Sequence, residues 1–211
     1  MEPLSWYRIA APVSVYIALL IYAAVRPNIR SKAVVFGATA MAVYGGAQDQ
    51  ISARLCPEYF TVLHNPIPGL TDPTLLALAW GFLGAMGGGV AVGYAAALAA
   101  TLGPRPQLTF RELIKPILFL IATVGTASAV TGGSVYISAE QFDIRVDPFL
   151  DRYIPVERQR GAFVVACYHL VAYVTAIIGS VVMCVWIGFE RARRAGVGGA
   201  TAPLPPDVRP V

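Results

Sequence analysis

Five long apolar segments constrain this chain more than any other feature of its sequence. They cover residues 9–25, 33–53, 74–101, 114–136 and 161–188. Only two charged residues, Asp49 and Lys115, lie inside them. Because a helix of about 17–25 apolar residues crosses the hydrocarbon core of a bilayer, we expect an all-α, polytopic integral membrane helix bundle with about five transmembrane helices.

The overall composition agrees with a chain whose solvent is lipid. Charged residues make up 13% of the 211 residues and hydrophobic residues 56%, whereas average soluble domains contain about 25% charged residues. So few charged side chains cannot cover the surface of a water-soluble globule of this length. The composition therefore excludes disordered, fibrous and nucleic-acid-binding proteins, and it makes the lipid bilayer the expected partner.

The distribution of Lys and Arg predicts the orientation of these segments. With five spans, the first and third connections and the C-terminal tail share one side, which holds ten basic and three acidic residues, against six and nine on the other side. Cytoplasmic loops carry the excess of Lys and Arg. We therefore expect a protein of the bacterial cytoplasmic (inner) membrane with its N-terminus outside and its C-terminus cytoplasmic, and with Arg191, Arg193 and Arg194 as an ordinary basic flank.

The chain is expected to form one membrane domain over residues 1–194, followed by a disordered cytoplasmic tail over residues 195–211. The tail is rich in Gly, Ala and Pro, a composition that cannot build a packed core. The first span, residues 9–25, is the shortest, and a cleaved signal peptide is the alternative interpretation of it.

Two long connections face the outer side, over residues 54–73 and 137–160. The first is dense in turn-forming pairs such as Asn65-Pro66 and Pro68-Gly69, so we expect an ordered loop. The second mixes aromatic and charged residues, which is typical of a helix that lies at the level of the lipid headgroups.

Small residues recur every four positions in the third and fourth spans. The third span carries Gly81, Ala85, Gly89 and Gly93, and the fourth carries Gly125, Ala129 and Gly133. Such spacing lets helix backbones approach closely in a membrane. We expect these two spans to pack against each other, and a homo-oligomer or another membrane protein on an exposed row of small residues is the alternative.

Polar residues gather at the end of the second span and in the loop after it, and they mark the candidate site. Asp49 is an acidic residue within a span, and intramembrane ionisable groups are costly enough to indicate function. The fifth span contributes two more polar residues near its outer end. The predicted outer-side polar pocket comprises Asp49, Gln50, Arg54, Glu58, His64, His169 and Tyr173.

Several interpretations of this pocket stay open. The plainest is structural, with Asp49 and Arg54 neutralising each other and His169 bonding a backbone carbonyl. A proton or ion relay would use Asp49, Glu58 and His169. A metal site would need both histidines and both acids, although no motif such as HExxH supports it. A lipid-headgroup site built on Arg54 is the remaining interpretation.

The stretch that begins at Asp49 resembles a set of uncharacterised bacterial polytopic inner-membrane proteins. Their pattern is (His/Gln)-Asp-Gln-x3-Arg-x3-Glu-Tyr-Phe-Thr-x2-His, followed by a helix with Pro-Thr-Leu-Leu and Trp-Gly. The matching residues are Asp49, Gln50, Arg54, Glu58, Tyr59, Phe60, Thr61, His64, Pro73, Thr74, Leu75, Leu76, Trp80 and Gly81. His169 and Tyr173 resemble a His-x3-Tyr of the last helix, and Gln48 stands where the relatives tend to have His. The resemblance implies a shared site without a known activity.

The leading expectation is a small structural or accessory membrane subunit without catalytic activity. The alternative is a membrane-embedded enzyme, or an ion- or proton-handling protein, that uses the acids and histidines of the pocket. Neither Ser52 nor Ser134 lies in the turn motif of a catalytic serine. The sequence names neither a substrate nor a cofactor, and both functions stay open at this point.

Overall fold

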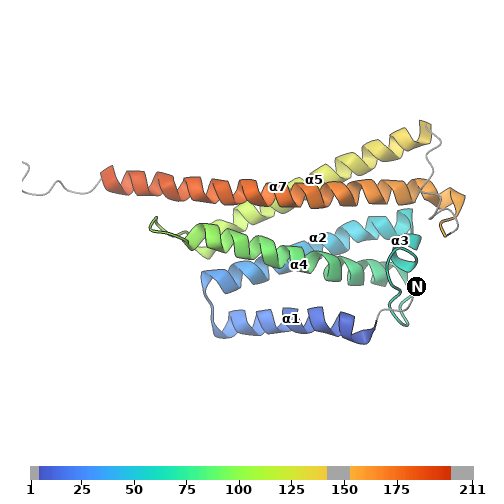
Figure 1. The fold of residues 1–211 in the computed structure, drawn as a ribbon, viewed down its shortest axis with the longest axis horizontal. Coiled ribbons are helices and arrows are strands. Elements are labelled where there is room, and N and C mark those ends of the chain that lie inside the picture. The colour runs from blue at the N-terminus through green and yellow to red at the C-terminus, as the bar shows by residue number, and fades with distance from the viewer. Residues whose placement is uncertain (1–4, 142–152, 201–211) are drawn as a thin grey trace, which may run out of the picture.

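The computed structural model describes residues 5–141 and 153–200, and the regular structure of this part of the chain is all α-helical. The helices are α1 (Trp6–Val25), α2 (Ile29–Leu55), α3 (Glu58–Thr61), α4 (Pro73–Thr101), α5 (Phe110–Gln141) and α7 (Val156–Ala200). The five long helices lie side by side in an elongated bundle (Figure 1). The expected all-α fold is confirmed.

Four of the helices, α1, α4, α5 and α7, are long and apolar enough to cross a membrane, which supports a multi-pass membrane protein. The predicted second span corresponds to α2, which has 27 residues and measures about 40 Å. Its basic first turn and its Gln-Asp-Gln segment make it less apolar than the other four. Arg30 and Lys32 are exposed at the start of α2, whereas Asp49 is buried inside the bundle, where α2 lies beside α4 (Figure 1).

Local signals set the helix boundaries. At the start of α2, the side chain of Asn28 accepts a hydrogen bond from the Ser31 amide, and the Ser31 hydroxyl accepts one from the Asn28 amide. This reciprocal pair is a capping box. Asp72 caps the first turn of α4 through a backbone amide, and Pro73 follows it at the first helical position. Only residues 26–28 separate α1 from α2, so these two helices run antiparallel.

Helices α2 and α4 form the closest pair in the bundle. A methyl group added at Gly81, Gly89 or Gly93 of α4 would overlap the main chain of α2. The contacts pair Gly81 with Gly45 and Gly46, Gly89 with Gly37, and Gly93 with Ala33. The rows of small residues on the third and fourth spans therefore do not pack on each other as expected, because a matching row of small residues on α2 allows a closer approach to α4.

The other small residues of the predicted packing rows have different neighbours. The side chain of Ala85 lies against Gly45, in the same α2–α4 contact. A methyl group at Gly125 of α5 would touch the ring of Tyr44 at 3.4 Å, whereas one at Gly133 would meet nothing within 4 Å. The fourth span therefore uses Gly125 against α2, while Gly133 has open space beside it.

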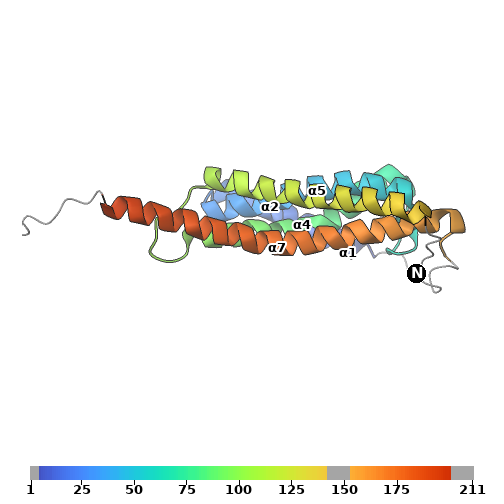
Figure 2. The same cartoon turned by 90° about the horizontal axis from the view of Figure 1, so that it is seen from above.

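Helices α5 and α7 form a second pair beside the first (Figures 1 and 2). One apolar core joins the pairs, and it contains Leu113, Ile117, Leu120 and Val124 of α5, Met183 and Ile187 of α7, and Ala96, Ala97 and Ala100 of α4. Helix α1 lies at the edge of the bundle and buries none of its residues. Its Tyr16 reaches the bundle through a hydrogen bond of 2.6 Å with Thr39.

The two ends of the bundle carry different connections (Figure 1). One end holds the start of α1, the loop around α3 and the start of α7. The opposite end holds residues 26–28, residues 102–109 and the end of α7. The three basic segments therefore share one end of the molecule, a necessary condition for the predicted orientation.

Helix α7 extends beyond the predicted fifth span. Its 45 residues make about 67 Å of helix, and its C-terminal end projects past the other helices (Figures 1 and 2). Residues 195–200 are therefore helical, which corrects the expectation of a disordered tail over them. Residues 201–211 lie outside the described residues, as do residues 142–152, for which a helix at the headgroup level was expected.

Candidate functional site

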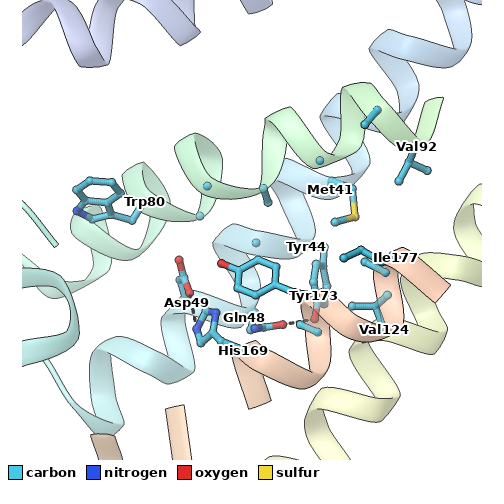
Figure 3. A pocket seen from close by; sticks show the side chains of 18 of the residues that line it. Met41, Tyr44, Gln48, Asp49, Trp80, Val92, Val124, His169, Tyr173 and Ile177 are labelled. Carbon is cyan, nitrogen blue, oxygen red and sulfur yellow. Dashed lines mark hydrogen bonds and ion pairs between the residues drawn. The ribbon is translucent and has the colours of Figure 1, made fainter. Parts of the chain in front are cut away.

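A cavity of about 430 Å³ lies among α2, α4 and α7, with α3 and the loop after it at one end. Small-molecule sites typically measure about 300–1,000 Å³. The end near the loop is lined by Tyr44, Gln48, Asp49, Tyr59, His64, Trp80, His169 and Tyr173. The rest is lined mainly by small and apolar residues, among them Gly84, Ala85, Gly88, Ala91, Val92, Val124, Ala172, Ala176 and Ile177. Figure 3 shows Asp49, His169 and Trp80 toward one end and Val92, Val124 and Ile177 toward the other.

The cavity exists because α4 carries two rows of small residues with different neighbours. The row that contains Gly81 and Gly89 closes α4 on α2. On the adjacent row, a methyl group at Gly84 or Gly88 would meet nothing within 4 Å. These two glycines leave room between α4 and α7 where larger side chains would fill it.

The cavity opens to the side of the bundle between α4 and α7. Gly84, Gly88 and Ala91 of α4 are exposed, and on α7 Tyr173 is 58% and Ile177 68% exposed. A side opening in a membrane-spanning bundle faces the lipid. A molecule dissolved in the bilayer can therefore reach the cavity without crossing the aqueous surface.

Asp49 is the centre of the polar end and is 6% exposed. It lies about 9 Å before the end of α2. Its Oδ1 accepts a hydrogen bond of 3.1 Å from the hydroxyl of Ser52, one turn further along α2, and lies 3.4 Å from Nε2 of His169 on α7. Ser52 also lies 3.1 Å from the same Nε2 and 2.5 Å from the hydroxyl of Tyr168.

The hydrogen-bond directions in this cluster follow from the number of protons. The Ser52 hydroxyl has one proton, which it donates to the Asp49 carboxylate, so it accepts from Tyr168 and from His169 Nε2–H. In a Ser-His-Asp triad the serine and the aspartate bond opposite nitrogens of the histidine, whereas here both lie near Nε2. Ser52 is also fully buried, so the cluster is a hydrogen-bond network and not a catalytic triad.

Aromatic rings enclose the polar end of the cavity. The ring of Tyr59 stacks on His169 at a centroid distance of 5.0 Å and meets His64 edge-on at 4.6 Å. His64 packs on Trp80 at 4.6 Å, and its Nδ1 donates to the Tyr59 carbonyl at 2.7 Å. Figure 3 shows the ring of Tyr173 lying across the cavity with its hydroxyl turned toward the side where Asp49 lies. Three separate segments thus place planar side chains around one carboxylate.

One buried polar atom near this wall is unsatisfied. The indole N–H of Trp80 is buried and has no hydrogen-bond partner among the described residues. An orphaned buried donor costs about 1–3 kcal/mol. The indole nevertheless occupies this position because its ring packs on His64 and closes the end of the cavity.

Three residues of the predicted pocket lie elsewhere. Arg54 is exposed and donates to the carbonyl and side-chain oxygens of Gln50, each at 2.8 Å, and to Thr74 at 3.4 Å. Arg54 therefore does not neutralise Asp49, and the headgroup site built on Arg54 does not include this cavity. Glu58 accepts a weak hydrogen bond of 3.5 Å from the thiol of Cys56. Of the predicted residues, the structure brings together Asp49, His64, His169 and Tyr173.

Burial shapes the chemistry of two groups beside the cavity. It raises the pKa of the Cys56 thiol to about 11, and the side chain is fully buried. It also raises the pKa of the Tyr59 hydroxyl above its ordinary value. Both groups are therefore neutral at physiological pH, and Cys56 is not a reactive thiol.

The sequence analysis missed several residues of the site, namely Tyr44, Gln48, Ser52 and Tyr168, and it gave Tyr59 and Trp80 no role beyond the motif. The hydroxyl of Tyr44 donates to the side-chain oxygen of Gln48 and lies 3.3 Å from Ser128 of α5. Helical spacing could have found Ser52, because it lies three residues after Asp49 and shares its face. Nothing in the sequence pairs Ser52 with α7.

The cavity lining contains few charged residues. No Lys or Arg lines it in the described part of the chain, and Asp49 is the acidic residue of the lining. Among the described residues, no group of three or more His, Cys, Asp or Glu side chains is arranged to hold a metal ion. The geometry therefore gives the metal-site interpretation no support.

Comparison with known proteins found no family model, no curated protein and no solved structure that matches the chain.

Proposed function

We propose that this protein is a non-enzymatic accessory protein of the bacterial cytoplasmic membrane that holds an amphipathic small molecule in the cavity between α4 and α7. The polar head of the molecule lies beside Asp49 and His169, and its apolar part lies along Gly88 and Ile177. The molecule enters from the bilayer through the side opening.

One observation carries this proposal, namely the change in polarity along a cavity that opens toward lipid. Asp49 and His169 stand at one end, and small or apolar side chains line the remainder. A water-soluble ligand would not match the apolar part, and a plain hydrocarbon would leave the polar end without partners. An amphipathic molecule matches both parts.

The resemblance to bacterial inner-membrane proteins supports the same site. Asp49, His64 and Trp80 belong to the shared pattern, and His169 belongs to the recurrent pair of the last helix; all four line the cavity. We propose that the related proteins share this cavity. The distribution of Lys and Arg supports an outward-facing polar end, with the N-terminus outside and the C-terminus cytoplasmic.

The proposal is tested by filling the cavity. Gly88→Leu places a side chain in the open space, whereas Gly87→Leu adds the same group at an exposed neighbour that does not line the cavity. Native mass spectrometry of protein purified in mild detergent should detect a bound amphipathic molecule in the wild type and in Gly87→Leu, and not in Gly88→Leu. Equal amounts of bound molecule in all three proteins would contradict the proposal.

An ion- or proton-handling protein is the second candidate, and the buried Asp49–His169 pair favours it. Ionisable pairs of this kind inside membranes mark proton pathways in many proteins. Proteoliposomes with a pH gradient provide the test. Proton flux in the wild type that Asp49→Asn abolishes would support this candidate, and equal flux in both proteins would exclude it.

A further inference from the structure

We infer that the head of the bound molecule is a cationic amine that pairs with the carboxylate of Asp49. The inference rests on the proposed function, because it names the chemical class of the molecule that the same cavity holds.

Charge complementarity is the first argument. Asp49 is the acid of the cavity, and no Lys or Arg stands in its described lining. An anionic head such as a phosphate would face a carboxylate with no Lys or Arg in the described lining, although phosphate sites depend on Arg or Lys. A cationic head finds the carboxylate, and the apolar surroundings weaken screening by water.

The aromatic rings around Asp49 are the second argument. Tyr59, Trp80 and Tyr173 line the same end of the cavity as the carboxylate. A cation near aromatic rings is attracted by their quadrupoles, and quaternary ammonium groups are commonly bound in cages of such rings. Neutral heads gain nothing comparable from this arrangement.

The burial of Asp49 is the third argument. A carboxylate buried in apolar surroundings needs a compensating positive charge, and Asp49 is 6% exposed. A cationic head that reaches the Asp49 carboxylate supplies this charge.

Few titratable groups surround the Asp49–His169 pair. The remaining titratable side chains around the pair are Tyr44 from α2, Tyr59 from α3, His64 from the following loop, and Tyr168 and Tyr173 from α7, with Cys56 packed beside Tyr168. Helices α4 and α5 contribute no titratable group to the lining. His64 is held by the Tyr59 carbonyl through Nδ1, so His169 is the histidine that pairs with Asp49.

The test uses two probes with the same alkyl chain, dodecyltrimethylammonium and the uncharged dodecyl tetraethylene glycol ether. The full chain, with Trp6→Phe and Trp186→Phe, is placed in phosphatidylcholine nanodiscs, so that the fluorescence of Trp80 reports on the cavity. We expect the cation to bind at least tenfold more tightly than the ether, and Asp49→Asn to remove this difference while ether binding persists. Retained ether binding shows that Asp49→Asn is folded.

Ether binding equal to or tighter than cation binding in the wild type would overturn the cationic head and leave the proposed function standing. Binding of neither probe to the wild type would overturn both proposals. A preference for the cation over the ether that persists in Asp49→Asn would overturn the role of Asp49.

Discussion

Arg191 shows how a charged side chain near the end of α7 becomes part of the core. Only 4% exposed, it donates to the carbonyls of Ala99 and Leu102 at 2.7 Å and to those of Arg105 and Pro106 at 2.9 Å. The first two belong to the end of α4, where carbonyls lack helical partners and the helix dipole is negative. The expectation of an ordinary basic flank is therefore wrong for Arg191.

Removing this guanidinium should destabilise the bundle. We predict that Arg191→Ala lowers the free energy of unfolding by roughly 2–4 kcal/mol, because several charge-assisted hydrogen bonds are lost together. Arg191→Lys should retain only part of this free energy of unfolding, since the compact ammonium of Lys cannot match the hydrogen bonds of the planar guanidinium. Thermal unfolding in detergent measures both effects. Arg193→Ala is the matched control, because that side chain is 71% exposed; an equal loss in the control would contradict the prediction.

Helical geometry at the residue scale explains why the predicted pocket was partly right. Successive helical residues are turned by about 100°, so Gln50 and Arg54 share one face of α2, while Asp49 and Ser52 share another. The first face meets Thr74 at the start of α4, and the second meets His169 of α7. The sequence placed all of these residues at one depth, and depth alone does not separate the two faces.

At the scale of elements, three consecutive glycines of α4 have three different surroundings. Gly87 is exposed and lies outside the cavity lining, Gly88 lines the cavity, and Gly89 lies against the backbone of α2 at Gly37. The spacing of small residues predicts where such rows lie on a helix. It does not say which neighbour each row meets, since α2, α4 and α5 all carry candidates, and this is why the expected partner of α4 was wrong.

The surroundings of these three glycines predict how the stability of the bundle responds when each is replaced by alanine. Gly89→Ala should separate α2 from α4 and lower the thermal unfolding temperature in detergent, because the added methyl group overlaps backbone that cannot move aside. Gly87→Ala and Gly88→Ala should leave that temperature unchanged or slightly raised, since alanine favours the helix by about 1 kcal/mol over glycine. A decrease in unfolding temperature for Gly87→Ala as large as that for Gly89→Ala would contradict the assigned packing.

At the scale of elements, the sequence also predicted several features correctly. All five apolar segments correspond to helices, because hydropathy and length depend on each segment alone. The ordered loop after α2 was also expected, and it packs Phe60 with Ala53, Leu76 and Ala77 in a small core. The end of α7 was missed because Gly and Ala composition does not exclude a helix that continues beyond the membrane.

At the scale of the whole molecule, the bundle is two helix pairs with a cavity where they meet. The α2–α4 pair and the α5–α7 pair share one core near the end of the bundle that carries residues 102–109. Toward the opposite end, small residues leave the space that holds Asp49. The cavity is thus a consequence of how the two pairs join, and it cannot be predicted from the sequence of any single helix.

The orientation of the bundle is testable by cysteine labelling in cells. In a background without the three native cysteines, a membrane-impermeant maleimide should label Thr71→Cys from outside and should label Arg105→Cys only after the membrane is permeabilised. Both positions are exposed. Position 71 is preferred to Gly69, whose φ of +74° would strain a larger residue. The reverse labelling pattern would contradict the predicted orientation.

Photolabelling can locate an amphipathic amine in the bundle. An alkyl amine that carries a diazirine in its chain is added to the protein in nanodiscs, activated by light, and located by mass spectrometry of the peptides. We expect labels concentrated on Gly84–Ala95 of α4 and Ala172–Ser180 of α7, and their loss in Gly88→Leu but not in Gly87→Leu. Labels spread evenly over the lipid-facing surfaces of α1 and α5, unchanged by Gly88→Leu, would contradict this expectation.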